Sequence, residues 1–224
     1  MSHFFLHRAM LAVMAVSALL ALLCSSVRVH AEGNDPDHLR GQISTVEPNA
    51  ITLKTSDGRS LRLLLVDATP VFTLQKASFS AVDFGLYVGS VAVRLDMTSP
   101  IVRATPRETI SWLYLGKELR IIDEKLRGIA VGFKKWDLPA GSSMTHGWVD
   151  DLENRVVSIK YGPTQDEESD VLVGPDVPVT RMSVGQRSDL KVGGHAFVGV
   201  NKAADGKLNA AFVFVGKDGL VPSL

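Results

Sequence analysis

Hydrophobic and polar residues alternate along most of the chain, and the alternation occurs in two similar copies. One copy begins at Arg40-Gly41-Gln42-Ile43 and the other at His146-Gly147-Trp148-Val149, and equivalent positions lie 104 to 108 residues apart. A period of two places successive side chains on opposite faces of a strand. We therefore expect a mainly β protein made of two tandem small antiparallel β-barrel modules. No segment shows a sustained helical period.

Turn residues divide the alternating segments into hairpins. In the first copy, Asp57-Gly58 separates Ile51-Thr52-Leu53 from Leu61-Arg62-Leu63-Leu64-Leu65, and an Asp-Gly pair between two alternating runs is a strong hairpin signal. The second copy has a longer acidic loop, 162–169, at the matching place. A further hairpin is expected at Asp205-Gly206.

These patterns divide the chain into five segments. They are a signal peptide at 1–31, a flexible leader at 32–38, a first β module at 39–116, a linker segment at 117–144 and a second β module at 145–224. Within the linker, Lys117–Ile122 is ambiguous between strand and helix. Asp123–Gly128 is expected to form one helical turn, with aspartate as the cap and glycine as the terminator. We expect the linker to pack between the two modules.

The N-terminal segment has the pattern of a secretory signal. Arg8 precedes the apolar run Ala9–Leu23, and Val29-His30-Ala31 supplies the small residue expected before a signal-peptidase cut. Cleavage after Ala31 would give a periplasmic protein with no stable membrane span. Two alternatives stay open, an uncleaved N-terminal anchor and a lipoprotein attached through Cys24. The second is disfavoured because no small residue directly precedes the cysteine.

Composition limits the chemistry of the mature chain. The full sequence has 24 basic and 24 acidic residues, and loss of Arg8 and Arg28 with the signal peptide leaves a net charge of −2. No basic surplus draws such a chain to nucleic acid, so we expect no nucleic-acid partner. Cys24 is the only cysteine and lies in the predicted signal peptide. The mature chain therefore has no disulfide and no zinc–thiolate site.

The repeated pattern resembles the DUF5666 type of small exported bacterial β domain. The resemblance rests on the Gly-x-Ile start, Ile51-Thr52-Leu53, Asp57-Gly58, Leu61-x-Leu63-x-Leu65 and Thr69-x-Val71. It covers residues 39–95 more closely than 145–215, where Pro178-Val179 stands in place of a threonine before the apolar residue. The resemblance implies an OB-like barrel and no established activity. The 126–145 segment also resembles a set of exported proteobacterial proteins, some of which carry metal-transporter names.

Metal binding in envelope metal homeostasis or transport is the alternative function. His146 and His195 lie on two strands of the second module that can be neighbours in a small barrel, and Asp150 follows His146 closely. Imidazole and carboxylate groups are ligands for zinc or copper. The sequence has no His-x-His or Glu-x-x-His spacing in the mature chain. We therefore predict no metal and no cofactor, with these three residues as the candidate ligands if a metal binds.

The sequence carries no pattern typical of catalysis. Ser142, Ser143 and Thr145 lie close together, but no Gly-x-Ser-x-Gly turn surrounds them. A hydrolase is therefore the weakest alternative, and we predict a non-enzymatic protein without catalytic residues.

Trp136 is the candidate contact to a ligand or partner. It follows Lys134 and Lys135 in a turn-rich segment, and an aromatic ring beside lysines can stack on a sugar or a base. The alternative is that Trp136 packs the linker between the two modules. We expect an exported periplasmic protein that binds a protein partner or a small ligand, or that scaffolds other envelope components. Its oligomeric state is left open.

Overall fold

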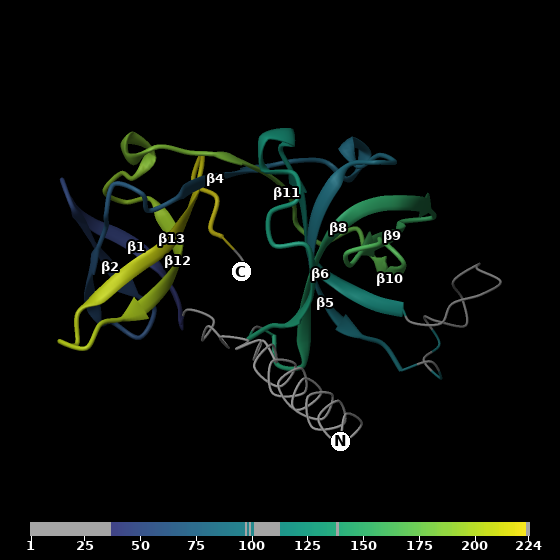
Figure 1. Ribbon diagram of the computed structural model, residues 1–224, viewed down its shortest axis with the longest axis horizontal. Coiled ribbons are helices and arrows are strands. Elements are labelled where there is room, and N and C mark those ends of the chain that lie inside the picture. Colours follow the sequence, from purple (N-terminus) through teal and green to yellow (C-terminus); the bar gives the residue numbers. More distant parts are fainter. Residues whose placement is uncertain (1–36, 97, 99, 101–112, 138, 223–224) are drawn as a thin grey trace, which may run out of the picture. The chain divides into compact units, whose positions relative to one another are not determined.

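The computed structural model describes residues 37–96, 98, 100, 113–137 and 139–222, which contain thirteen strands and three single-turn 3-10 helices (Figure 1). The strands are β1 (Asp37–Glu47), β2 (Ala50–Thr55), β3 (Ser60–Leu64), β4 (Val71–Lys76), β5 (Tyr87–Arg94), β6 (Leu113–Ile122), β7 (Gly132–Lys135), β8 (Ser142–Glu153), β9 (Val156–Tyr161), β10 (Glu167–Leu172), β11 (Val179–Val184), β12 (His195–Lys202) and β13 (Leu208–Gly216). The helices are η1 (Phe79–Ala81), η2 (Glu124–Leu126) and η3 (Arg187–Asp189).

The predicted signal peptide at 1–31, its cleavage after Ala31 and most of the predicted leader lie outside the described residues. Within the part of the chain that the structure describes, no helix has the length and hydropathy needed to cross a bilayer.

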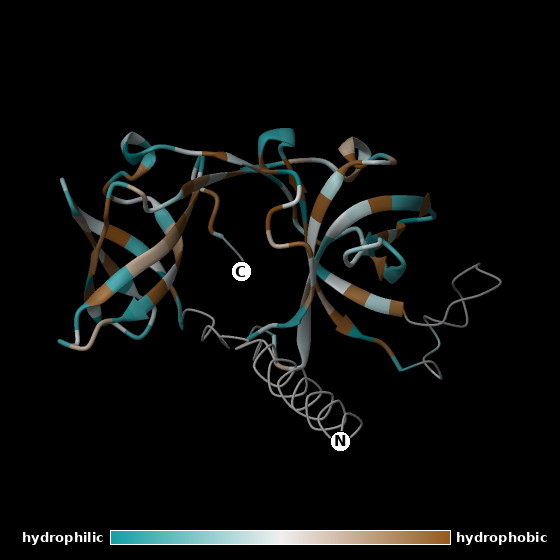
Figure 2. Cartoon of the chain, viewed as in Figure 1, coloured by the Kyte–Doolittle hydropathy of each residue, from teal (hydrophilic) through white to brown (hydrophobic). Residues whose placement is uncertain are grey.

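The expected mainly β architecture is confirmed, as are two predicted hairpins. Asp57-Gly58 joins β2 to β3, and Asp205-Gly206 joins β12 to β13. Gly58 has φ +84° and Gly206 has φ +82°, the left-handed conformation that a tight turn requires and that glycine adopts without steric cost. Figure 2 shows hydrophobic and hydrophilic residues alternating along the strands, as the period-two pattern predicts.

Strand pairing closes two circuits of five strands each. In the first barrel, β1, β2, β3, β13 and β12 follow one another around the circuit, which closes through the parallel pair β3–β13 and the antiparallel pair β1–β12. In the second barrel, β5, β6, β10, β9 and β8 form the circuit, which closes through the parallel pair β6–β10 and the antiparallel pair β5–β8.

Each barrel combines strands from both sequence copies. Strands β1 to β3 belong to the first copy, but β12 and β13, which complete their barrel, belong to the second (Figure 1). In the same way, β8 to β10 of the second copy close with β5 and β6 of the first. The expectation that each copy closes its own barrel, one within 39–116 and one within 145–224, does not match this pairing. The two copies exchange their last two strands.

Strands β4 and β11 join the two barrels into one continuous sheet. They pair antiparallel with Leu74 opposite Met182, Phe72 opposite Val184 and Lys76 opposite Thr180. Each also pairs in parallel with the last strand of a barrel, β4 with β13 and β11 with β6. Leu74 and Met182, at the centre of this register, occupy equivalent positions in the two copies. The two halves are therefore related by a local pseudo-twofold pairing.

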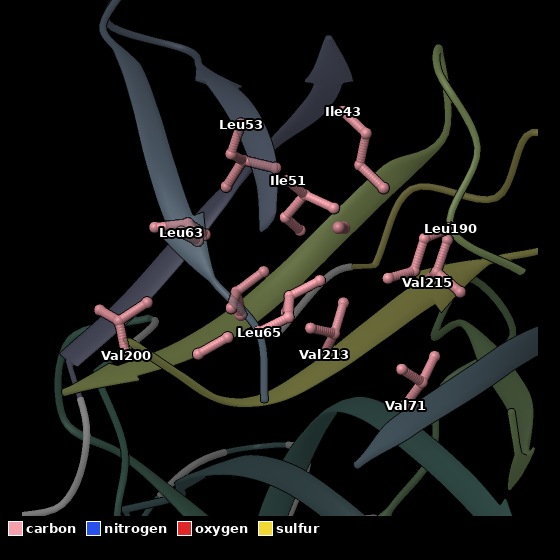
Figure 3. Packing of buried hydrophobic residues seen from close by; sticks show 13 residues of the cluster. Ile43, Ile51, Leu53, Leu63, Leu65, Val71, Leu190, Val200, Val213 and Val215 are labelled. Atoms are coloured by element: carbon pink, nitrogen blue, oxygen red, sulfur yellow. The ribbon is translucent and has the colours of Figure 1, made fainter. Parts of the chain in front are cut away.

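Each barrel has its own apolar core. The core of the first barrel is seen in Figure 3 and contains Ile43, Ile51, Leu53, Leu63, Leu65, Val71, Leu190, Ala196, Val198, Val200, Ala210, Val213 and Val215. The core of the second barrel contains Val82, Val88, Ala92, Leu119, Ile121, Val149, Val157, Ile159, Val171, Val173 and Val179. Burial of one such aliphatic side chain contributes about 1.5–3 kcal/mol, so these clusters supply much of the stability of the described residues, which contain no cysteine.

Part of the predicted linker, 117–144, is strand. Lys117–Ile122 forms the second half of β6, which resolves its ambiguity. The segment lacked a clean alternation because both of its faces are buried, with Leu119 and Ile121 in the barrel core and Ile122 in a separate apolar cluster. The predicted single turn is confirmed as η2. Asp123 stands at its N-cap position, but its side chain makes no capping hydrogen bond.

Candidate ligand-binding site

A cavity of about 230 Å³ is lined by residues from both barrels and from the joining strands. Its lining residues are Phe72, Arg120, Ile129, Ala130, Lys134, Trp136, Met144, His146, Met182, Phe197, Phe212 and Phe214. A larger depression of about 480 Å³ lies beside η2 and β11, but charged side chains such as Asp123, Lys125 and Arg181 line much of it. Small-molecule sites are usually apolar with a few placed polar groups, so the aromatic cavity is the stronger candidate.

The cavity is formed by the faces that the strands turn away from the barrel cores. On β12 and β13, the core residues alternate with phenylalanines of the lining, because successive side chains of a strand point to opposite faces. On β6, Leu119 and Ile121 enter the core, whereas Arg120 between them reaches the cavity. Met144 and His146 share one face of β8 in the same way.

The phenylalanine rings form a continuous wall. The ring centroids of Phe72 and Phe214 lie 5.0 Å apart, those of Phe212 and Phe214 5.4 Å apart, and those of Phe197 and Phe214 5.8 Å apart. Such separations are typical of aromatic pairs that stabilise each other. Phe197 is fully buried, and Phe212 and Phe214 are half-buried.

A buried ion pair fixes a guanidinium group at this wall. Arg120 Nη2 and Nε donate to Glu118 Oε1 at 2.7 and 3.3 Å, and each of the two side chains is 3% exposed. The Arg120 guanidinium also lies 5.2 Å from the centroid of the Phe214 ring. Removing one partner of a buried pair leaves an uncompensated charge. Glu118 therefore holds Arg120 in place, and the Glu118 carboxylate accepts both hydrogen bonds from the guanidinium group.

His146 contributes a neutral imidazole. It lies opposite Gly89 of β5 and Gly132 of β7, and a β-carbon at Gly89 would lie 2.8 Å from its ring, so glycine leaves the space that the ring fills. Burial lowers the pKa of His146 to about 3, and the positive charges of Arg120 and Lys134 add to this effect. The ring is therefore uncharged at neutral pH.

Trp136 closes another part of the cavity. Its ring is tilted against the His38 ring with centroids 4.5 Å apart and lies 6.0 Å from the Phe197 ring, and Lys134 Nζ lies 5.4 Å from its centroid. Among the described residues, the buried Trp136 Nε1 has no hydrogen-bond partner. A buried donor without a partner is unusual and costs free energy, so this N–H is a donor that a ligand can use.

The structure brings together some of the residues predicted to be functional and separates others. Lys134, Trp136 and His146 line one cavity, whereas Lys135 is exposed and outside the lining. Trp136 packs against His38 of β1 and Phe197 of β12 and also lines the cavity. Its contact with a ligand stays a prediction.

The three metal-ligand candidates have different surroundings. Asp150 forms an ion pair with Lys160 at 2.8 Å, and His195 lies at the start of β12 opposite Gln42. His146 faces the aromatic cavity. Across residues 37–96, 113–137 and 139–222, no group of three or more His, Cys, Asp or Glu side chains is arranged to hold a metal ion.

Sequence reasoning missed the ion pair and the phenylalanines. A signal was present for each: Glu118 and Arg120 alternate with the apolar Leu119 and Ile121, and Phe212 and Phe214 repeat at a period of two beside core valines. An aromatic set on the face opposite the core indicates a second buried surface.

Comparison of the chain with protein-family models, with curated proteins and with solved structures found no match. The resemblance to the DUF5666 type and the OB-like assignment therefore stay predictions.

Proposed function

We propose that the protein is a non-enzymatic binding protein of the cell envelope that holds a small, mainly apolar ligand in the aromatic cavity. The observation that carries this proposal is the cavity itself, about 230 Å³ in volume with five aromatic and two methionine side chains in its lining. An engineered apolar cavity of about 150 Å³ in another protein binds benzene. The larger cavity has space for one ring with a short substituent.

The chemistry of the lining favours binding over catalysis. Acid–base catalysis works best with a group whose pKa lies near the working pH, but the pKa of His146 is lowered to about 3. The Glu118 carboxylate is held by Arg120. The envelope location is supported by the sequence pattern of 1–31 and is part of the proposal.

Calorimetric titration with phenylacetate and with benzyl alcohol tests the proposed function. Ala130 is exposed and lines the cavity, so Ala130→Phe should fill part of the space without disturbing either barrel core. Ala140→Phe makes the same change at an exposed loop position outside the lining and is the matched control.

We expect at least one of the two compounds to bind to the wild type and to Ala140→Phe, and to lose at least about tenfold in affinity in Ala130→Phe. Failure of both compounds to bind, or binding that Ala130→Phe leaves intact, would contradict the proposed function.

A further inference from the structure

We infer that the ligand of this cavity is a small aromatic acid, a single ring with one anionic group on a short substituent. The inference rests on the proposed function and adds the charge of the ligand. Its first support is the sign of the charge on the side chains that line the cavity. The charged side chains that line the cavity are Arg120 and Lys134, both cationic, and no acidic residue is among the described lining residues.

The aromatic faces of the site are already next to cations. Arg120 lies over Phe214 at 5.2 Å and Lys134 over Trp136 at 5.4 Å, and Arg40 lies over Phe197 at 4.8 Å. Rings in such positions attract positive charge through their quadrupole. A cationic ligand would have to displace or approach these groups. An anion would meet Lys134 with favourable charge and Arg120 through the N–H groups that do not bond Glu118, whereas Arg40 is paired with Asp137 at 3.2 Å.

The geometry of the Arg120 side chain fits this role. Arg120 Nε and Nη2 both donate to one carboxylate oxygen of Glu118. These two atoms form one edge of a guanidinium group that has five N–H donors in a rigid fork. The Trp136 Nε1–H adds a buried donor without a partner in the described structure. The same positive charges disfavour protonation of His146.

The size of the cavity limits the apolar part of the ligand. The cavity volume is about 230 Å³, and a cavity of roughly 150 Å³ holds one benzene ring. The remaining volume is too small for a second ring. A monocyclic acid therefore fits, with its ring against the phenylalanine wall and its anionic group toward Arg120 and Lys134.

Three compounds of nearly the same shape test the charge directly. Phenylacetate, phenylacetamide and phenylacetamidine are anionic, neutral and cationic at pH 7, and each is titrated into the full chain by calorimetry. We expect phenylacetate to bind roughly tenfold more tightly than phenylacetamide, because charge-assisted hydrogen bonds are about twice as strong as neutral ones, and phenylacetamidine to bind most weakly.

The variants Lys134→Gln and Lys135→Gln locate the effect. Both remove one lysine charge from β7, but only Lys134 lines the cavity. Lys134→Gln should reduce the preference for phenylacetate over phenylacetamide about fivefold, the order of a partly exposed charge pair. Lys135→Gln should leave the preference unchanged.

The outcomes separate this inference from the proposed function. Equal or tighter binding of phenylacetamide or phenylacetamidine would overturn the inference and leave the proposed function standing. A preference for phenylacetate that Lys134→Gln does not reduce would also overturn it, because the acid group would then lie elsewhere. If none of the three compounds binds but benzyl alcohol does, the inference fails and the proposed function stands. If benzyl alcohol does not bind either, both fail.

Discussion

Two glycines occupy equivalent places in the two copies because the paired strand leaves no room for a side chain. A β-carbon at Gly41 would lie 2.3 Å from the carbonyl oxygen of Lys54, and one at Gly147 would lie 2.1 Å from that of Lys160. The contact is with backbone, so it can be relieved only if β1 separates from β2 or β8 from β9. This steric requirement explains the glycine found at the start of each copy.

Gly147→Ala is expected to lower the free energy of unfolding by more than about 2 kcal/mol, because the clash opens a ladder inside the second barrel. Gly174→Ala is the matched control, since a β-carbon there would make ordinary contact with Val177 at 3.7 Å. Urea denaturation measures both variants. Equal midpoints for the two would contradict the close approach of β8 and β9.

His146 predicts an acid-dependent loss of stability. Burial lowers its pKa in the folded protein to about 3, against 6.5 for an unperturbed histidine. As the pH falls below 6.5, the unfolded chain takes up a proton that the folded protein does not, so the free energy of unfolding falls between pH 6.5 and about 3. Above pH 6.5, His146 makes no contribution to the pH dependence of the free energy of unfolding.

The variant His146→Gln should lose this part of the pH dependence. Urea denaturation at pH 7.5 and at pH 4.5 gives the comparison, and the difference between the two pH values should be smaller in the variant than in the wild type. An identical difference in both proteins would mean that His146 is protonated in the folded state.

The exchange of strands between the two copies explains how the cavity forms. The outward faces of β12 and β13 carry the phenylalanines, and those of β6 and β8 carry Arg120 and His146. The exchange, together with the pairing of β4 and β11, lets residues of both copies line one cavity.

Alternation and turns were sufficient to predict local elements but not their partners. The hairpin at Asp57-Gly58 depends on neighbouring residues and could be read from them. The strand that pairs with β1 could not be predicted, because β5 and β12 have similar apolar patterns and either one could pair with the edge of β1. The Val-Gly pairs of the two copies are not structurally equivalent, because Val88 lies within β5, whereas Gly193 has φ +85° in the turn before β12.

The exchange predicts particular contacts between strands. Arg40 lies opposite Phe197 of β12, whereas a barrel closed within the first copy would place it opposite Gly89, the partner of His146 in the second barrel. Nuclear Overhauser effects between backbone protons should therefore connect Arg40 to Phe197. Effects from Arg40 to Gly89 in their place would contradict the exchange.

At the scale of the whole molecule, the candidate site was predictable only in part. The sequence indicated Trp136 and Lys134 because an aromatic residue beside lysines in a turn-rich segment is a local signal. Arg120 and Phe214 were not predicted, because their role depends on which strands meet across the two barrels. A binding site built from the faces opposite two cores becomes visible only when both cores and their connection are known.

The inferred binding of a small aromatic acid in the cavity lined by both barrels has a direct spectroscopic readout. In methyl-resolved NMR during titration with phenylacetate, a bound ring shifts nearby methyl resonances. Met144 and Met182 line the cavity, whereas Leu53 and Val213 lie in the core of the first barrel. We expect saturable shifts of both methionine methyl resonances, with the Leu53 and Val213 methyl resonances unchanged. Unshifted methionines at a concentration that saturates calorimetric binding, or equal shifts throughout, would contradict it.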